Sequence, residues 1–236
     1  MQNKWYWIFR NIIFGPFLRV YNRPEIVGVD NIPSAGPAII ASNHQSVMDS
    51  FFLPLLCPRQ ITFLAKAEYF NGTTPVGRLQ KWFFTNVGQR PVNRTSASAG
   101  QDALNTAVEV LNDGDLFGIY PEGTRSPDGR LYKGKTGVAR IALASGAQVI
   151  PVAMIGTKDV NPIGTWFPRP GKVRVKVGDP IYPIEFVNNR GLERDSYEAI
   201  RALTDHIMRQ LQQLSGQEYA DVYAAEVKKA LAEGGD

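Results

Sequence analysis

Short apolar runs alternate with longer amphipathic segments along most of this 236-residue chain. Short apolar runs without a helical period are typical of buried strands, whereas amphipathic segments of roughly ten residues are typical of helices. Alternation of the two predicts an α/β domain with a mostly parallel central sheet flanked by helices. We expect strands at 25–29, 38–41, 61–64, 115–120, 148–153 and 172–177, and helices at 47–56, 102–111, 138–144 and 200–214.

The N-terminal segment is unusually aromatic, because tryptophan, tyrosine, phenylalanine and isoleucine side chains crowd around Arg10 and Arg19. A spanning helix needs about 20 consecutive apolar residues, and these charges interrupt the run. Aromatic rings beside cations suit the headgroup region of a bilayer. We therefore predict that residues 1–22 form a membrane-interface segment, helical over 4–21 and broken near 15–16. The alternative is a core helix covered by the rest of the domain.

Composition limits the remaining possibilities. With 44% hydrophobic and 20% charged residues, the chain can bury a sizeable core, and we expect residues 23–236 to form one domain. A formal charge of +4 favours anionic partners such as phosphates or lipid head groups. One cysteine and two histidines are too few for a closed metal site, so no metal is expected. No nucleic-acid-binding module is recognisable, so nucleic acid is not an expected partner.

A histidine follows the strand expected at 38–41, at the edge of the sheet where α/β proteins form their sites. Within one regular helix, His44 and Asp49 would point about 140° apart. If the helix instead begins near residue 46, Asp49 can reach back to the imidazole, fix its tautomer and leave the other nitrogen free to take a proton from an alcohol. The alternative is a helix capping box over 46–49, in which Asp49 only satisfies the backbone.

Four segments together carry a resemblance to a known family. Residues 43–49 (NHQSVMD) resemble the N-H-x-x-x-x-D motif of the glycerolipid acyltransferases, which include the bacterial lysophosphatidic acid acyltransferases. Further segments are similar to the family's other blocks, in the same order, at 88–94, 120–126 and 149–153. Tyr120 stands where the family usually has phenylalanine, and Asn93 where it usually has an acid. Neither departure removes a chemical group that the mechanism needs, and the joint match is highly specific.

The resemblance implies transfer of a fatty acyl group from acyl-CoA or acyl carrier protein to lysophosphatidate, giving phosphatidate, with no other cofactor. Glycerol-3-phosphate, another lysophospholipid or a glycolipid remain alternative acceptors. The bilayer is the implied partner, at the cytoplasmic face of the cell membrane, and the oligomeric state stays open. The implied catalytic pair is His44 and Asp49. The implied substrate-binding residues are Asn43, Lys66, Gly88, Arg94, Glu122, Gly123, Thr124 and Arg125.

The chemistry of these residues agrees with such a role. Arg94 and Arg125 each offer a planar fork of donors to a phosphate, although an ordinary surface ion pair is the alternative. Gly123 permits close backbone approach, and we expect its N–H to be exposed. No G-x-S-x-G pattern is present, so direct transfer is favoured over a covalent acyl-enzyme.

Two functions of other classes stay open. Residues 129–136 satisfy the G-x-x-x-x-G-K-T pattern of nucleotide-binding phosphate loops, although the pattern does not directly follow a strand. ATP turnover would identify that class. The aromatic start and basic surface also suit a membrane-binding protein without catalysis, in which a His44→Ala variant would keep every measurable property.

Overall fold

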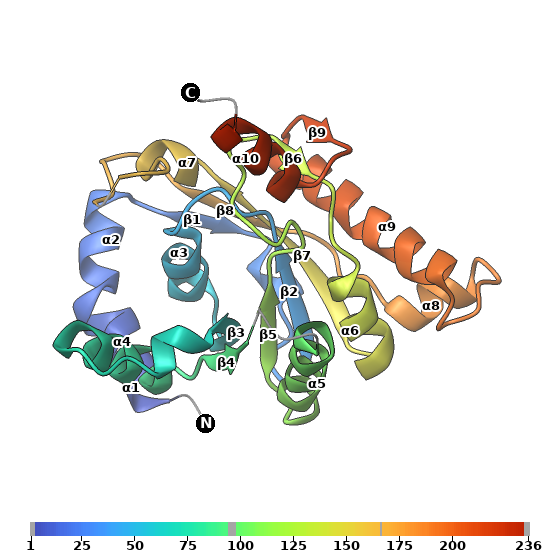
Figure 1. The fold of residues 1–236 in the computed structure, drawn as a ribbon, viewed down its shortest axis with the longest axis horizontal. Helices are drawn as coiled ribbons and strands as arrows, with labels where there is room; N and C mark the ends of the chain where they lie inside the picture. The colour runs from blue at the N-terminus through green and yellow to red at the C-terminus, as the bar shows by residue number, and fades with distance from the viewer. Residues whose placement is uncertain (1–2, 94–97, 166, 234–236) are drawn as a thin grey trace.

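The computed structural model of the chain describes residues 3–93, 98–165 and 167–233. Its main feature is a seven-stranded sheet with the order β1-β8-β7-β2-β5-β3-β4 (Figure 1). Neighbouring strands pair in parallel except β7 and β8, so the predicted α/β class with a mostly parallel sheet is confirmed. The strands are β1 (Glu25–Val27), β2 (Ala38–Ser42), β3 (Ile61–Lys66), β4 (Arg90–Val92), β5 (Leu116–Ile119), β7 (Gln148–Ile155) and β8 (Arg174–Val177), and a separate pair is formed by β6 (Leu131–Tyr132) and β9 (Tyr219–Ala220).

Helices cover both faces of the sheet (Figure 1). The α-helices are α1 (Lys4–Ile8), α2 (Gly15–Tyr21), α3 (Asp49–Leu56), α4 (Pro75–Asn86), α5 (Ala99–Asn112), α6 (Gly137–Ser145), α7 (Thr157–Val160), α8 (Pro183–Asn188), α9 (Tyr197–Ser215) and α10 (Ala224–Glu233). Shorter helical turns are η1 (Phe9–Ile13, a π-helix), η2 (Val29–Asn31) and η3 (Ala67–Phe70).

Strand β2 lies at the centre of the sheet and divides the core into two layers. Successive side chains of a strand point to opposite faces. Ile39 and Ala41 accordingly join the cluster made with α5, α6 and α9, whereas Ala38 and Ile40 join the cluster made with α3. All four side chains are fully buried. Burial on both faces explains why this strand is continuously apolar in sequence, and it fixes the point at which the loop beginning with Asn43 leaves the sheet.

The N-terminal segment is interrupted at Phe14, next to the predicted break, but its first part is not a regular α-helix. A π-helical stretch, η1, follows α1 and brings the Arg10 carbonyl close to Gly15. A Cβ atom on Gly15 would lie 1.8 Å from that carbonyl oxygen, so only glycine fits there. The Arg10 guanidinium is tied to the domain, because its Nε donates to the Leu55 carbonyl at 3.0 Å.

The aromatic segment has one side packed on the domain and one side exposed, and its place at a membrane stays a prediction. Tyr6, Phe9 and Leu18 are buried against the domain, as expected of a core helix. The opposite side presents large apolar residues to the outside, and α4 adds more of them. They are Trp5, Trp7, Ile12, Ile13, Phe17 and Val20 in the segment and Val76, Leu79 and Trp82 on α4. Among the described residues, no helix is both long and apolar enough to cross a bilayer.

Candidate active site

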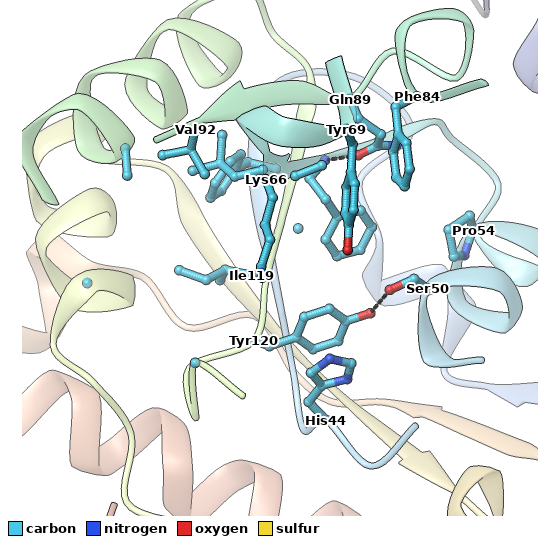
Figure 2. A pocket seen from close by; sticks show the side chains of 18 of the residues that line it. His44, Ser50, Pro54, Lys66, Tyr69, Phe84, Gln89, Val92, Ile119 and Tyr120 are labelled. Atoms are coloured by element: carbon cyan, nitrogen blue, oxygen red, sulfur yellow. Dashed lines mark hydrogen bonds between the residues drawn. The ribbon is translucent and has the colours of Figure 1, made fainter. Parts of the chain in front are cut away.

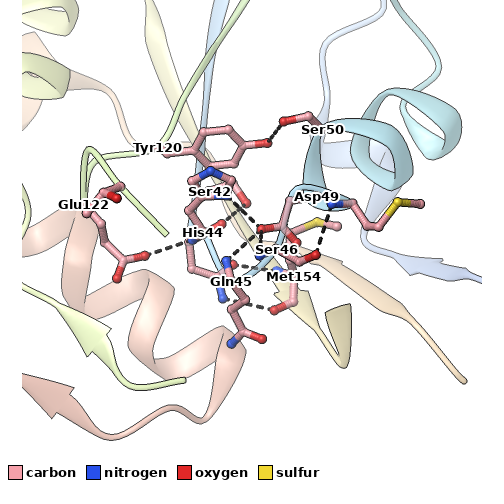
Figure 3. Close-up of polar contacts among 12 residues, drawn as sticks. Ser42, His44, Gln45, Ser46, Asp49, Ser50, Tyr120, Glu122 and Met154 are labelled. Carbon is pink, nitrogen blue, oxygen red and sulfur yellow. Dashed lines mark hydrogen bonds and ion pairs between the residues drawn. The ribbon is translucent and has the colours of Figure 1, made fainter. Parts of the chain in front are cut away.

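His44 and Asp49 meet at the end of β2, in the way the turn hypothesis predicted. The loop after Ser42 carries the histidine, and α3 begins at Asp49, so the carboxylate reaches back from the first helical position (Figure 3). His44 Nδ1 lies 2.9 Å from Asp49 Oδ2. A carboxylate can only accept, so Nδ1 carries the proton and Nε2 keeps its lone pair. The imidazole is thereby prepared to act as a base.

The capping alternative is also partly realised. Asp49 Oδ2 accepts from the backbone N–H groups of Gln45 at 2.7 Å and Ser46 at 2.9 Å, in addition to the imidazole. The reciprocal contact of a capping box is replaced, because Ser46 Oγ bonds to Asn161 and receives the Met48 N–H. One fully buried carboxylate oxygen therefore fixes both the loop and the imidazole.

The aromatic ring of Tyr120 lies flat on the His44 imidazole, with 3.9 Å between ring centroids and 11° between planes. The Tyr120 hydroxyl is 3.0 Å from Ser50 Oγ on α3 (Figure 2). The Phe63 ring also stacks on Tyr120, with 5.5 Å between ring centroids. Burial raises the pKa of this phenol. The stack leaves the imidazole little freedom to turn. The sequence offered no signal for this contact beyond the departure from phenylalanine.

Glu122 connects the third sequence block to the first. Its Oε1 accepts the backbone N–H of His44 at 2.9 Å (Figure 3). Its Oε2 accepts the backbone N–H of Tyr132 at 3.0 Å. The carboxyl group is 1% exposed, and this burial raises its pKa to about 7. A second connection comes from the Ser126 N–H, which donates to the His44 carbonyl at 2.7 Å. Glu122 therefore holds the backbone of the loop that carries His44.

The turn after Glu122 carries positive charge. The cavity that contains His44 is also lined by Gly123, Thr124 and Arg125. Lys135 lies close to this turn, since a Cβ atom added to Gly123 would be 3.3 Å from Lys135 Nζ. The expectation that Gly123 exposes its N–H is wrong, because that group donates to the Tyr120 carbonyl at 2.9 Å. The glycine is needed instead for its left-handed φ of 73°.

The other predicted substrate-binding residues occupy different places. Lys66 is exposed at the end of β3 and lines the cavity (Figure 2). Asn43 is fully buried, and its amide bonds to the backbone of Met154 and to Gln217, so it supports the loop. Gly88 lies in the turn before β4, where its φ of 76° demands glycine, and it lines a different, polar cavity. Arg94 lies outside the described residues.

The cavity that contains His44 has a volume of about 1250 Å³. Its lining includes aromatic and aliphatic side chains from the N-terminal segment, α3 and α4; Pro54 and Phe84 are labelled in Figure 2. It also includes five cationic side chains, those of Arg10, Lys66, Arg125, Lys135 and Arg140. A cavity of this kind suits a molecule that is part hydrocarbon and part anion.

The phosphate-loop pattern at 129–136 does not form a phosphate loop. Its middle residues, Leu131 and Tyr132, are strand β6 and pair with β9. Lys133 forms an ion pair with Asp221 at 3.0 Å. Within the described parts of the chain, no three histidine, cysteine or acidic side chains gather in a way that could hold a metal ion.

Comparison with known proteins identifies the class to which this chain belongs. Residues 23–155, more than half of the chain, match the model of the Acyltransferase family, and the chain belongs to this family. It is 32% identical over 177 residues to a chloroplastic 1-acyl-sn-glycerol-3-phosphate acyltransferase of Arabidopsis thaliana, a match that covers 74% of this chain and 47% of that protein. It is 27% identical over 201 residues to the 1-acyl-sn-glycerol-3-phosphate acyltransferase of Bacillus subtilis strain 168, covering 84% of this chain and 87% of that one.

A crystal structure shows the same architecture. The 1-acyl-sn-glycerophosphate acyltransferase of Thermotoga maritima superposes with a TM-score of 0.62 and 27% identity, over 87% of this chain and 81% of that one. The chain spans about half the length of the two chloroplastic relatives that it matches.

Proposed function

We propose that this protein transfers a fatty acyl group from a thioester donor, acyl-CoA or acyl carrier protein, to the free hydroxyl of lysophosphatidate, giving phosphatidate. The observation that carries the proposal is the pairing of His44 Nδ1 with buried Asp49 at 2.9 Å beside a large, partly apolar cavity. The relatives from Arabidopsis, Bacillus and Thermotoga support it, since each is named for acylation of a 1-acyl-glycerophosphate.

The proposed reaction needs one base and no covalent enzyme intermediate. His44 Nε2 removes the proton of the acceptor hydroxyl as its oxygen attacks the thioester carbonyl. Asp49 stabilises the imidazolium that forms, and the stacked Tyr120 ring keeps the imidazole from turning away from Asp49. When the tetrahedral intermediate collapses, the carbon–sulfur bond breaks, and the imidazolium returns its proton to the departing thiolate.

The polarity of the cavity supports an acyl-lipid substrate. Phe9, Phe14 and Phe83 belong to its apolar lining, which suits a hydrocarbon chain. Arg125 and Lys135 belong to its cationic lining, which suits the phosphate of the acceptor. A neutral glycolipid acceptor would leave these cations without an anionic partner.

The exposed apolar side chains of the N-terminal segment and α4 support a place at the membrane interface. Trp7, Phe17 and Trp82 are between two fifths and three fifths exposed. Their removal from water into the headgroup boundary would be favourable. Buried members of the same segment, Tyr6 and Phe9, also line the cavity. A lysolipid could therefore pass from the bilayer to His44 without leaving apolar surroundings, at what we propose is the cytoplasmic face.

The decisive experiment is transfer of radiolabelled oleoyl-CoA to a panel of lysophosphatidate, glycerol-3-phosphate and other lysolipids, with His44→Ala alongside. We expect lysophosphatidate turnover in the wild type and a loss of about 10²- to 10⁴-fold in the variant. His206→Ala is the matched control, because that imidazole lies on α9, packs on Phe186 of α8, and should leave turnover unchanged when removed. Equal activity of wild type and His44→Ala would sink the mechanism, and turnover of another acceptor alone would change the substrate. Vesicle binding should survive in both variants.

A further inference from the structure

The C-terminal segment, residues 216–233, lies beyond the part of the chain that matches the family model, yet it returns to the loops of the site. Helix α9 ends at Gly216, whose left-handed φ of 71° reverses the chain. Strand β9 then pairs with β6, and α10 follows beside them (Figure 1). The segment is therefore placed against residues 122–132, the third sequence block and its continuation.

Two side chains of this segment contact the site loops directly. Gln217 Oε1 accepts from Asn43 Nδ2 at 2.7 Å, and Gln217 Nε2 donates to the Gly129 carbonyl at 2.6 Å. Lys228 Nζ, on α10, donates to Thr124 Oγ1 at 2.8 Å. Thr124 lines the cavity that contains His44. One face of α10 thus reaches the cationic turn itself and does not merely cover β6.

Two charged groups, Arg125 and Glu122, act on the ammonium group of Lys228. Burial and the neighbouring Arg125 lower the pKa of Lys228. Glu122 is already occupied by the backbone of His44 and Tyr132. Among the described residues, neither Lys228 nor Arg125 forms an ion pair. Two neighbouring cations without a paired carboxylate repel one another, and a bound dianion would relieve that repulsion.

We propose that Lys228 is a positioning and specificity-determining residue for phosphorylated acceptors. Its bond to Thr124 Oγ1 fixes the turn that presents Arg125, and its charge strengthens the positive potential at that turn. The C-terminal helix thereby completes the phosphate-binding part of the site. This proposal rests on the proposed function, because it takes the phosphate of lysophosphatidate as the anion.

The test uses the full-length protein with Lys228→Met, Lys228→Arg and Lys229→Met. Lys229 is the matched control, since it lies next along α10, its side chain is 77% exposed, and it forms an ion pair with Glu233 at 3.7 Å. Losing one charge-assisted bond at a half-buried site should raise the KM for lysophosphatidate roughly tenfold in Lys228→Met. The KM for acyl-CoA and kcat should stay within about twofold, and Lys228→Arg should recover most of the affinity. Lys229→Met should match the wild type.

A calorimetric arm makes the result independent of turnover. A soluble short-chain lysophosphatidate and the corresponding monoacylglycerol are titrated into each protein, and only the phosphorylated ligand should bind more weakly to Lys228→Met. Equal lysophosphatidate affinity of wild type and Lys228→Met would overturn the inference while leaving the proposed function intact. A lower melting temperature with equal losses for both ligands would also overturn it, because α10 would then be only structural. Absence of lysophosphatidate turnover with phosphate-dependent binding retained would count against the proposed function alone.

Discussion

The loop 43–49 and the turn 123–125 face one cavity, but the charged group of the loop has bonded partners within the protein and the cations at the turn have no ion-pair partner among the described residues. In the first, Asp49 accepts three hydrogen bonds on one oxygen and is fully buried. In the second, Arg125 forms no ion pair with any described residue, and neither does the neighbouring Lys135. One half of the site is therefore held by hydrogen bonds within the protein, all of them to Asp49 Oδ2, while Asp49 Oδ1 is buried without a partner among the described residues. The other half still offers charge to a ligand.

The loop 43–49 and the turn 123–125 have different roles in the proposed reaction. A base must be oriented before the substrate arrives, because reorganisation during the reaction would add to the barrier. A binding group gains by remaining unpaired, because an internal ion pair would have to be broken before the ligand could bind. The comparison therefore separates kcat from KM: changes in the 43–49 loop should lower the rate, and changes in the 123–125 turn should weaken acceptor binding.

The largest effect is expected for Asp49→Asn. An amide oxygen can still accept the same three hydrogen bonds, so the loop is kept, but the charge that stabilises the imidazolium is lost. We expect kcat to fall on the order of 10²- to 10⁴-fold, with the acceptor KM unchanged. Steady-state kinetics with lysophosphatidate would measure this. A fall of less than about fivefold would mean that Asp49 serves the backbone alone, as in a capping box.

Glu122 directly precedes the turn 123–125 in sequence, but its side chain bonds to the loop 43–49. Its titration therefore tests how firmly that loop is held. In the unfolded chain its pKa is near 4.5, and in the folded protein burial raises it to about 7. Between these values the folded protein holds more protons, so the free energy of unfolding falls as the pH rises through this window. The fall attributable to Glu122 is up to about 3 kcal/mol.

Chemical denaturation at intervals between pH 4 and 8 would measure how far the free energy of unfolding falls with pH. Glu122→Gln should remove this part of the slope, while losing one main-chain hydrogen bond, about 1 kcal/mol, at every pH. Asp128→Asn is a suitable control, because that carboxylate is exposed and its pKa, lowered to about 2 by its bonded neighbours, lies outside the window. Identical slopes for Glu122→Gln and wild type would show that Glu122 does not titrate in this range.

Much of the frame was predictable from sequence, because burial on both faces leaves a strong local signal. The apolar run expected as a strand at 38–41 is the central strand β2, Ala38–Ser42, and the helix expected at 200–214 is α9, Tyr197–Ser215. The resemblance to acyltransferases also pointed correctly to the family. Helix α4 was not predicted, because Pro75 and Gly77 in its first turn are residue types common in loops, and its apolar side faces an aromatic segment far away in sequence.

The site was only partly predictable, for a physical reason. The reach of Asp49 to His44 follows from a turn of the chain and could be anticipated from spacing. The stack of Tyr120 on His44, the bond of Glu122 to the His44 backbone and the contact from Lys228 are tertiary. Each joins elements that meet only after the sheet is assembled, and no local pattern encodes them.

Arg125→Ala tests the second half of the comparison, with a smaller expected effect. Removing the guanidinium should raise the acceptor KM roughly 10- to 100-fold, since a phosphate then loses a charge-assisted, forked donor. Arg125→Lys keeps the charge without the fork and should fall between Ala and wild type. The measurement is acceptor KM against kcat, with Arg140→Ala as a control for general loss of positive charge in the same cavity. If Arg125→Ala lowered kcat as strongly as Asp49→Asn while the KM stayed constant, the division between a chemical loop and a binding turn would fail, and the arginine would belong with the groups that stabilise the transition state.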